Sequence, residues 1–136
     1  MDIAAFNSLS RPGSPNTCLV APEGICANAM PDKTSERYLD EPKALFALIL
    51  DVVEAETRWT VTAQDADEGT ISFIATSKLM RYKDDVSILV LPARGEESGS
   101  ELAIYSRSRV GYSDMGANRK RVLDLLKRLK DRQKQV

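Results

Sequence analysis

The chain has 136 residues, 43% of them hydrophobic and 29% charged, with a formal net charge of −1. This is the composition of one globular domain with a single core, and it excludes a disordered or fibrous chain. The longest apolar run, residues 44–50, is far shorter than the roughly 20 residues that a membrane helix needs. No signal peptide is recognisable at the start. The location stays open between the cytoplasm and a membrane-associated or periplasmic place, the latter if an N-terminal anchor has been removed.

Residues 1–40 are expected to form an N-terminal arm that is mostly loop. Turn residues dominate 7–42, and the prolines at 22, 31 and 42 interrupt any long element. One short strand is expected at 17–21. The arm should run over the surface of the domain that follows it.

The arm also carries the two cysteines, Cys18 and Cys26. Their spacing fits no zinc pattern, and the chain has no histidine to complete one, so no metal site is expected. They can form a disulfide in an oxidising compartment or remain two small buried thiols. The sequence favours neither alternative.

Residues 41–132 are predicted to form one α+β domain, followed by a basic tail at 133–136. A helix over 41–56, with Asp40 as its N-cap, precedes strands at 58–64, 70–77, 85–92 and 101–110, and a helix over 115–132 closes the domain. Short connections, including polar loops at 65–69 and 93–100, predict an antiparallel meander of four to five strands. The two amphipathic helices should pack on one face, in the order α-β-β-β-β-α.

Alternation along the strands predicts which side chains occupy the sheet face away from the helices. This face should be rich in hydroxyl groups and open to water. Its expected members are Thr60, Thr62, Ser72, Ile74, Thr76, Ser87, Leu89, Tyr105, Arg107 and Arg109.

The stretch "RSRVGYSDMGANRKRV", residues 107–122, joins the last strand to the last helix. Gly111 permits the bend, Ser113 or Asp114 can cap the helix, and Gly116 allows close backbone approach. Asn118 falls on the apolar stripe of the helix and should point inward. Because a buried amide needs partners, we expect it to bond to the backbone of loop 111–114 or of the N-terminal arm.

The same stretch also has the features of an anion site, because a helix N-terminus attracts negative charge. Arg107, Arg109, Arg119 and Arg121 can converge there on a phosphate or carboxylate. Asp114 opposes this, and Asp84 and Asp85 are available as internal partners for the arginines. Internal pairing is the expected outcome, with anion binding as the open alternative.

Four segments resemble domain-of-unknown-function family 1499: "SPNTCLVAP", the single Trp59, "RYKDDVSI" and "YSRSRVGYSDMGANRKRV". The resemblance covers about Pro15 to Leu129 and implies membership of a bacterial or plastid family, often with an N-terminal membrane segment, to which no activity is assigned. It also implies that the family's characteristic positions are Asp85, Ser106, Arg107, Ser108, Arg109, Gly111, Asp114, Gly116 and Asn118.

Without histidine, the chain has no His-based triad and no His-ligated metal, and no cofactor is expected. Nucleic-acid binding is not expected, because Tyr105 is the sole aromatic side chain on the predicted open face. The favoured function is a monomeric, non-catalytic binding module for a small anionic ligand or a protein partner. Its candidate ligand-binding residues are Tyr105, Ser106, Arg107, Ser108, Arg109, Tyr112, Asp114, Asn118 and Arg119, supported by Trp59, Asp85, Gly111 and Gly116.

Two alternatives remain. A hydrolase or transferase would use Ser106, Ser108 or Ser113 as nucleophile, with Arg107 or Arg109 stabilising charge. A peripheral membrane protein would attach through the basic C-terminal helix.

Overall fold

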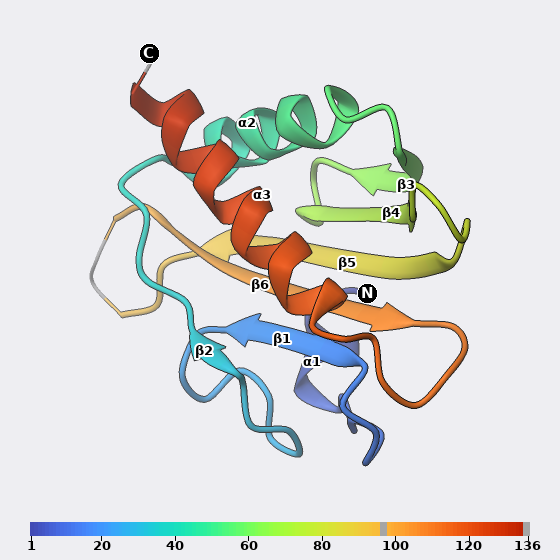
Figure 1. Cartoon of the computed structure of the whole chain (residues 1–136). Coiled ribbons are helices and arrows are strands. Elements are labelled where there is room, and N and C mark those ends of the chain that lie inside the picture. Colours follow the sequence, from blue (N-terminus) through green and yellow to red (C-terminus); the bar gives the residue numbers. More distant parts are fainter. Residues whose placement is uncertain (96–97, 135–136) are drawn as a thin grey trace.

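The computed structural model describes residues 1–95 and 98–134, and it shows an α+β protein (Figure 1). The elements in chain order are α1 (Ile3–Asn7), β1 (Thr17–Ala21), β2 (Lys33–Thr34), α2 (Pro42–Glu54), β3 (Trp59–Asp65), β4 (Thr70–Thr76), β5 (Lys83–Pro92), β6 (Ser100–Ser108) and α3 (Ala117–Lys134).

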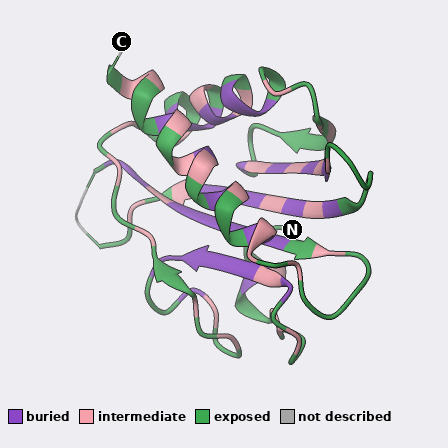
Figure 2. Ribbon diagram, in the orientation of Figure 1, coloured by how far each residue is buried: buried purple, intermediate pink, exposed green. Residues whose placement is uncertain are grey.

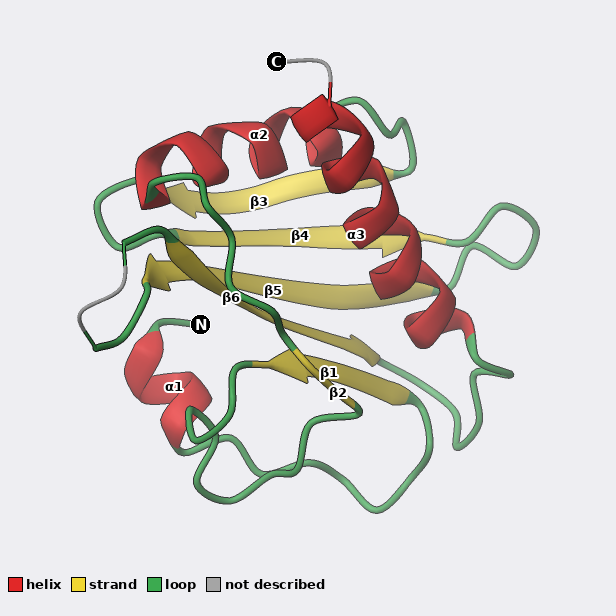
Figure 3. Ribbon diagram, turned by 90° about the vertical axis from the view of Figure 1, so that its left-hand side faces the viewer, coloured by secondary structure: helices red, strands yellow, loops and turns green. Residues whose placement is uncertain are grey.

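The strands form one six-stranded sheet in the order β2-β1-β6-β5-β4-β3 (Figure 3). Strands β3 to β6 are the predicted antiparallel meander, and the expected strand at 17–21 adds to β6 in antiparallel register. The prediction of four to five antiparallel strands is wrong at one edge. There the short β2 pairs with β1 in parallel, which makes the sheet mixed.

Helices α2 and α3 pack on one face of the sheet, as predicted (Figure 1). Pro42 starts α2 with a fixed backbone angle, so Asp40 is not its N-cap: that position belongs to Glu41, whose side chain makes no capping bond. The main core contains buried residues of both helices and of the strands beneath them, including Leu45, Ile49, Phe73, Ile88, Ile104 and Leu125.

The opposite face is not open throughout. The N-terminal arm and α1 cover the half near β1 and bury a second, smaller core that includes Phe6, Leu19, Leu89 and Tyr105 (Figure 2). The predicted exposure of Leu89 and Tyr105 is therefore wrong, because strand alternation assigns a face without showing what covers it. The half near β3 and β4, with Thr60 and Thr62, is exposed as expected.

The two cysteines are free thiols, so the disulfide alternative is wrong. Cys18 packs in the main core, whereas Cys26 packs against the second core on the other side of the sheet. Burial raises the pKa of the Cys18 thiol to about 11.

Helix α3 begins at Ala117, two residues later than predicted. Met115, the first residue of the predicted helix, is instead 89% exposed with a φ of 54°. The helix runs on to Lys134, so the first half of the expected basic tail is helical. Residues 135–136 of that tail, and residues 96–97 of the predicted loop 93–100, lie outside the described residues. Within the described chain, no helix has the length and apolarity to cross a membrane.

Candidate functional site

A network of buried polar side chains lies beneath the N-terminus of α3. At its centre Asn118 and Ser106 are both inaccessible to solvent. The Ser106 hydroxyl donates to Asn118 Oδ1 at 2.6 Å, and Arg121 Nη1 donates to the same oxygen at 2.9 Å. Asn118 Nδ2 donates to the backbone carbonyl of Asn16 at 2.9 Å. The expectation that Asn118 points inward and bonds to the N-terminal arm is confirmed.

The amide nitrogen of Asn118 also holds the start of the helix. Its Nδ2 lies 2.6 Å from Asp114 Oδ2 and 2.9 Å from Ser108 Oγ. Asp114 accepts from the backbone N–H groups of Gly116 at 2.8 Å and Asn118 at 3.1 Å. Burial raises the pKa of the Asp114 carboxyl, but these hydrogen bonds outweigh it and leave the pKa below its ordinary value. The anion position at this helix N-terminus is therefore occupied by a carboxylate of the chain itself.

The two neighbouring aspartates of β5 fix two arginines on opposite sides of the sheet. Asp84 binds Arg121 on the helix side at 2.9 Å, with side chains only 9% and 12% exposed. Asp85 accepts two hydrogen bonds from Arg109 on the other side, at 2.9 and 3.0 Å, in a pair that is open to solvent. The hydrogen bond and charge of Arg109 lower the pKa of Asp85.

The predicted ligand-binding residues therefore do not meet at one place. Ser106 and Asn118 are buried in the network, and Tyr105 is covered by the arm. Arg107, Tyr112 and Arg119 are exposed, and Ser108 contacts Asn118. The convergence of four arginines on one anion is wrong, because Arg109 and Arg121 are paired with aspartates on different faces.

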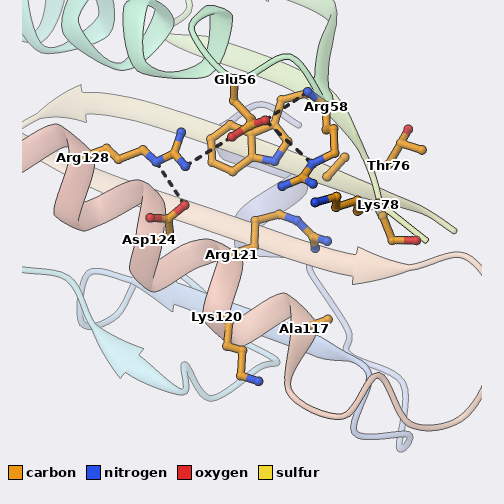
Figure 4. Close-up of a pocket in the computed structure, with 12 residues that line it drawn as sticks. Glu56, Arg58, Thr76, Lys78, Ala117, Lys120, Arg121, Asp124 and Arg128 are labelled. Atoms are coloured by element: carbon orange, nitrogen blue, oxygen red, sulfur yellow. Dashed lines mark hydrogen bonds and ion pairs between the residues drawn. The ribbon is translucent and has the colours of Figure 1, made fainter. Parts of the chain in front are cut away.

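A cleft that the sequence did not reveal lies between α3, the start of β3 and the end of β4 (Figure 4). Its volume is about 430 Å³, within the range of small-molecule sites. The small side chains of Ala75 and Ala117 leave room there, and Trp59 forms an apolar wall. The remaining lining residues are Glu56, Arg58, Thr76, Ser77, Lys78, Lys120, Arg121, Asp124 and Arg128.

The Trp59 wall is held in place by its neighbours. The ring packs against Phe73 with 5.1 Å between centroids, and the Arg128 guanidinium lies 5.4 Å from the Trp59 centroid. Arg128 is held in turn by Glu56 at 3.2 Å and Asp124 at 3.1 Å. The backbone N–H of Arg58 donates to Glu56 and, together with Arg128, lowers the pKa of that carboxyl against the opposing effect of burial.

Positive charge exceeds negative charge in the cleft. Five cations line it, against the two carboxylates Glu56 and Asp124. Both carboxylates are already bound to Arg128. Among the residues that the structure describes, Lys78 and Lys120 make no ion pair, and both are exposed at the cleft. The cleft therefore offers free positive charge next to a flat aromatic ring.

The chain matches the profile of a known protein family. The profile of the family described as protein of unknown function DUF1499 matches residues 12–129. The chain belongs to this family. The match includes both the buried network and the cleft of this DUF1499 member.

No curated protein matches the chain. Among solved structures, it is similar to TTHA0849 from Thermus thermophilus, with 12% sequence identity and a TM-score of 0.36. The alignment covers 72% of this chain and 92% of that one.

The three serines considered as nucleophiles, Ser106, Ser108 and Ser113, all have hydrogen-bond partners in this family member. Ser106 is inaccessible and bound to Asn118, and the hydroxyl of Ser113 accepts from the backbone of Met115. Across residues 1–95 and 98–134, no group of three or more Cys, Asp or Glu side chains is arranged to hold a metal ion.

Proposed function

We propose that this DUF1499 protein is a non-catalytic binding module, and that the cleft beside Trp59 holds a small anionic ligand with a flat apolar part. One observation carries the proposal: Lys78 and Lys120, which have no ion pair among the described residues, line the same 430 Å³ cleft as the held tryptophan ring. An acid group of the ligand would contact Lys78 and Lys120, because cations in a concave site attract anions. Its apolar part would pack against the part of Trp59 that Phe73 and Arg128 leave exposed.

The other candidate surfaces support binding less well. The helix N-terminus is capped by Asp114, which would repel an anion. Arg109, on the other side of the sheet, already has both oxygens of Asp85 as partners. A ligand at either place would have to displace an internal carboxylate, whereas the lysines of the cleft need no such exchange.

The single tryptophan makes this proposal directly testable, because its fluorescence reports on the cleft alone. Phenyl phosphate serves as the probe, with inorganic phosphate and benzyl alcohol as controls for its acid and its ring. We expect phenyl phosphate to change the Trp59 emission saturably, at a concentration several times lower than either control. Lys120→Gln should weaken this probe by about fivefold, which corresponds to about 1 kcal/mol for one charge-assisted contact.

Lys130→Gln is the matched control, since Lys130 is an exposed lysine of the same helix that does not line the cleft. It should leave the titration unchanged. An emission that does not saturate with phenyl phosphate, or an equal loss in the two lysine variants, would contradict the proposal.

A further inference from the structure

Two loops at one end of the sheet carry large apolar side chains outside both cores. In the β4–β5 loop, Leu79, Met80 and Tyr82 are 87%, 65% and 53% exposed. In the β6–α3 segment, Val110, Tyr112 and Met115 are 62%, 70% and 89% exposed. We call residues 77–82 and 109–116 together the two-loop tip. Large exposed apolar groups that gather at one place mark an interaction surface, whereas scattered ones need no explanation.

The strand register brings the two loops together at this end of the sheet. Lys83, at the start of β5, pairs with Thr76 at the end of β4. The next residue, Asp84, pairs with Ser108 at the end of β6. Figure 1 shows both loops projecting beyond the same end of the sheet, and Figure 2 shows them mainly exposed.

The backbone of the tip is strained at two positions. Within the described residues, Arg81 and Met115 are the non-glycine residues with positive φ, at 57° and 54°. The left-handed region is unfavourable for side chains with a Cβ atom, and such strain gathers where function requires it. Met115 gains little contact within the protein in return, because 89% of it is exposed. The conformation makes sense if these side chains contact something outside the protein.

Positive charge surrounds the apolar groups. The tip and the ends of the strands and helix that flank it, residues 77–85 and 107–121, contain eight Lys or Arg (78, 81, 83, 107, 109, 119, 120 and 121) against three Asp (84, 85 and 114), a net charge of +5 on a chain of net −1. Arg109 and Arg121 are bound to the β5 aspartates. The other six cations are exposed and make no ion pair within the described chain.

We propose that the two-loop tip docks on a bilayer surface that contains anionic lipids. Leu79, Met80, Tyr112 and Met115 enter the boundary between headgroups and acyl chains, while Arg81, Lys83 and their neighbours contact lipid phosphates. Cations next to a membrane and apolar groups within it act together in peripheral binding. This inference does not rest on the ligand proposed for the cleft.

The arrangement fits a bilayer better than a protein partner. In the β4–β5 loop the cations alternate closely with the apolar groups, in the order Lys78, Leu79, Met80, Arg81, Tyr82 and Lys83. The centre of a protein interface is instead depleted of charge. Loops that project separately can insert side chains between lipids, where long basic side chains reach back to the headgroups.

The tip also differs from the membrane contact expected of the basic C-terminal helix. It lies at the N-terminal end of α3 (Figure 1). Near the other end, Arg128 is bound to Glu56 and Asp124, and Arg132 lies 4.0 Å from Asp51. These internal pairs reduce the charge that the C-terminal half of α3 can offer to a membrane.

Flotation of the full chain with vesicles tests the proposal. The vesicles contain phosphatidylcholine alone or with about 30% phosphatidylserine, since the charge of the latter should be required. Leu79→Gln combined with Met115→Gln should lower the partition coefficient at least about tenfold, because two apolar insertions are lost. Leu39→Gln is the matched control: Leu39 is 82% exposed, but it follows Tyr38, which pairs with Ser100 at the other end of β6.

A second pair of variants separates the tip from the terminal helix. Arg81→Gln should reduce binding about fivefold, the contribution of one cation near an anionic surface, and Lys130→Gln should not. Absence of wild-type binding to anionic vesicles would overturn the proposal. An equal loss with Lys130→Gln would also overturn it, in favour of the helix. Self-association that depends on the tip, without vesicle binding, would make the tip an interface between copies and overturn it too.

Discussion

The buried network and the Trp59 cleft both use side chains of α3, but they balance charge differently. In the network, Arg121 has Asp84 as a partner and Asn118 has its own set of hydrogen bonds. No described side-chain nitrogen or oxygen that is buried lacks a partner. In the cleft, Lys78 and Lys120 have no ionic partner within residues 1–95 and 98–134. The paired polar groups of the network therefore hold this fold together, whereas the exposed lysines of the cleft are available to a ligand.

Arg121 gives the strongest test of this difference, because it belongs to the network and also lines the cleft. Arg121→Met should lower the free energy of unfolding by about 3–5 kcal/mol, since Asp84 would be left buried without its partner. Urea denaturation measures this loss. Adding Asp84→Leu should recover much of the lost free energy. A loss of less than about 1 kcal/mol in Arg121→Met alone would contradict the stabilising role given to the Arg121–Asp84 pair.

Asn118→Ala should have the next largest effect. The change removes a group bonded to β6, to the arm and to Asp114, so we expect a loss of about 1–3 kcal/mol from the free energy of unfolding. The variant should also respond less to acid. A lowered pKa of Asp114 in the folded protein stabilises it above the unfolded pKa, and this contribution disappears as the pH falls through the folded pKa.

Because Asn118 contributes to that lowered pKa, its removal shrinks the acid-dependent part of the stability. Urea titrations at about pH 7 and about pH 3 measure this part as the difference between the two free energies. The difference should be smaller in Asn118→Ala than in the wild type. An unchanged difference would show that Asp114 is held by the backbone N–H groups alone.

Arg109→Gln should have the smallest effect and sharpens the contrast with Arg121. The two arginines bind adjacent aspartates at the same distance of 2.9 Å, but the Arg109 pair is about 42% exposed. Exposed ion pairs contribute little, because water solvates both partners almost as well. The midpoint of urea denaturation should therefore stay within experimental error, and a loss comparable to that of Arg121→Met would refute the role given to burial.

Local patterns predicted the elements of this fold that depend on local sequence. The predicted helix at 41–56 corresponds to α2 at Pro42–Glu54, and the turn before Thr70 requires Gly69, where a Cβ would lie 2.1 Å from the Val90 carbonyl oxygen. The covering of Leu89 and Tyr105 could not be predicted, because it depends on an arm whose composition is that of a loop. Helix α1 and the short β2 are part of that arm.

The inward Asn118 was predictable because it falls on the same helical stripe as Val122 and Leu125. The cleft was not, because it depends on where α3 crosses the sheet relative to β3 and β4, and no local pattern encodes that crossing. Two signals were nevertheless present. A lone tryptophan begins β3, and the small residues Ala75 and Ala117 occupy positions where larger side chains would close the gap.

The position of β1 within the sheet has a consequence for how the chain is made. Strand β1 is synthesised well before β6, yet Thr17 of β1 pairs with Arg107 of β6, far along the chain. The β3–β6 hairpins can form from neighbouring segments, whereas β1 must wait for a distant partner, and such non-local pairing is slow. Until it docks, β6 is an open edge with Tyr105 uncovered, a site at which nascent chains can pair with one another. The N-terminal arm thus completes the fold when it docks on β6. The time before this docking is the period in which we expect the protein to be most prone to aggregation.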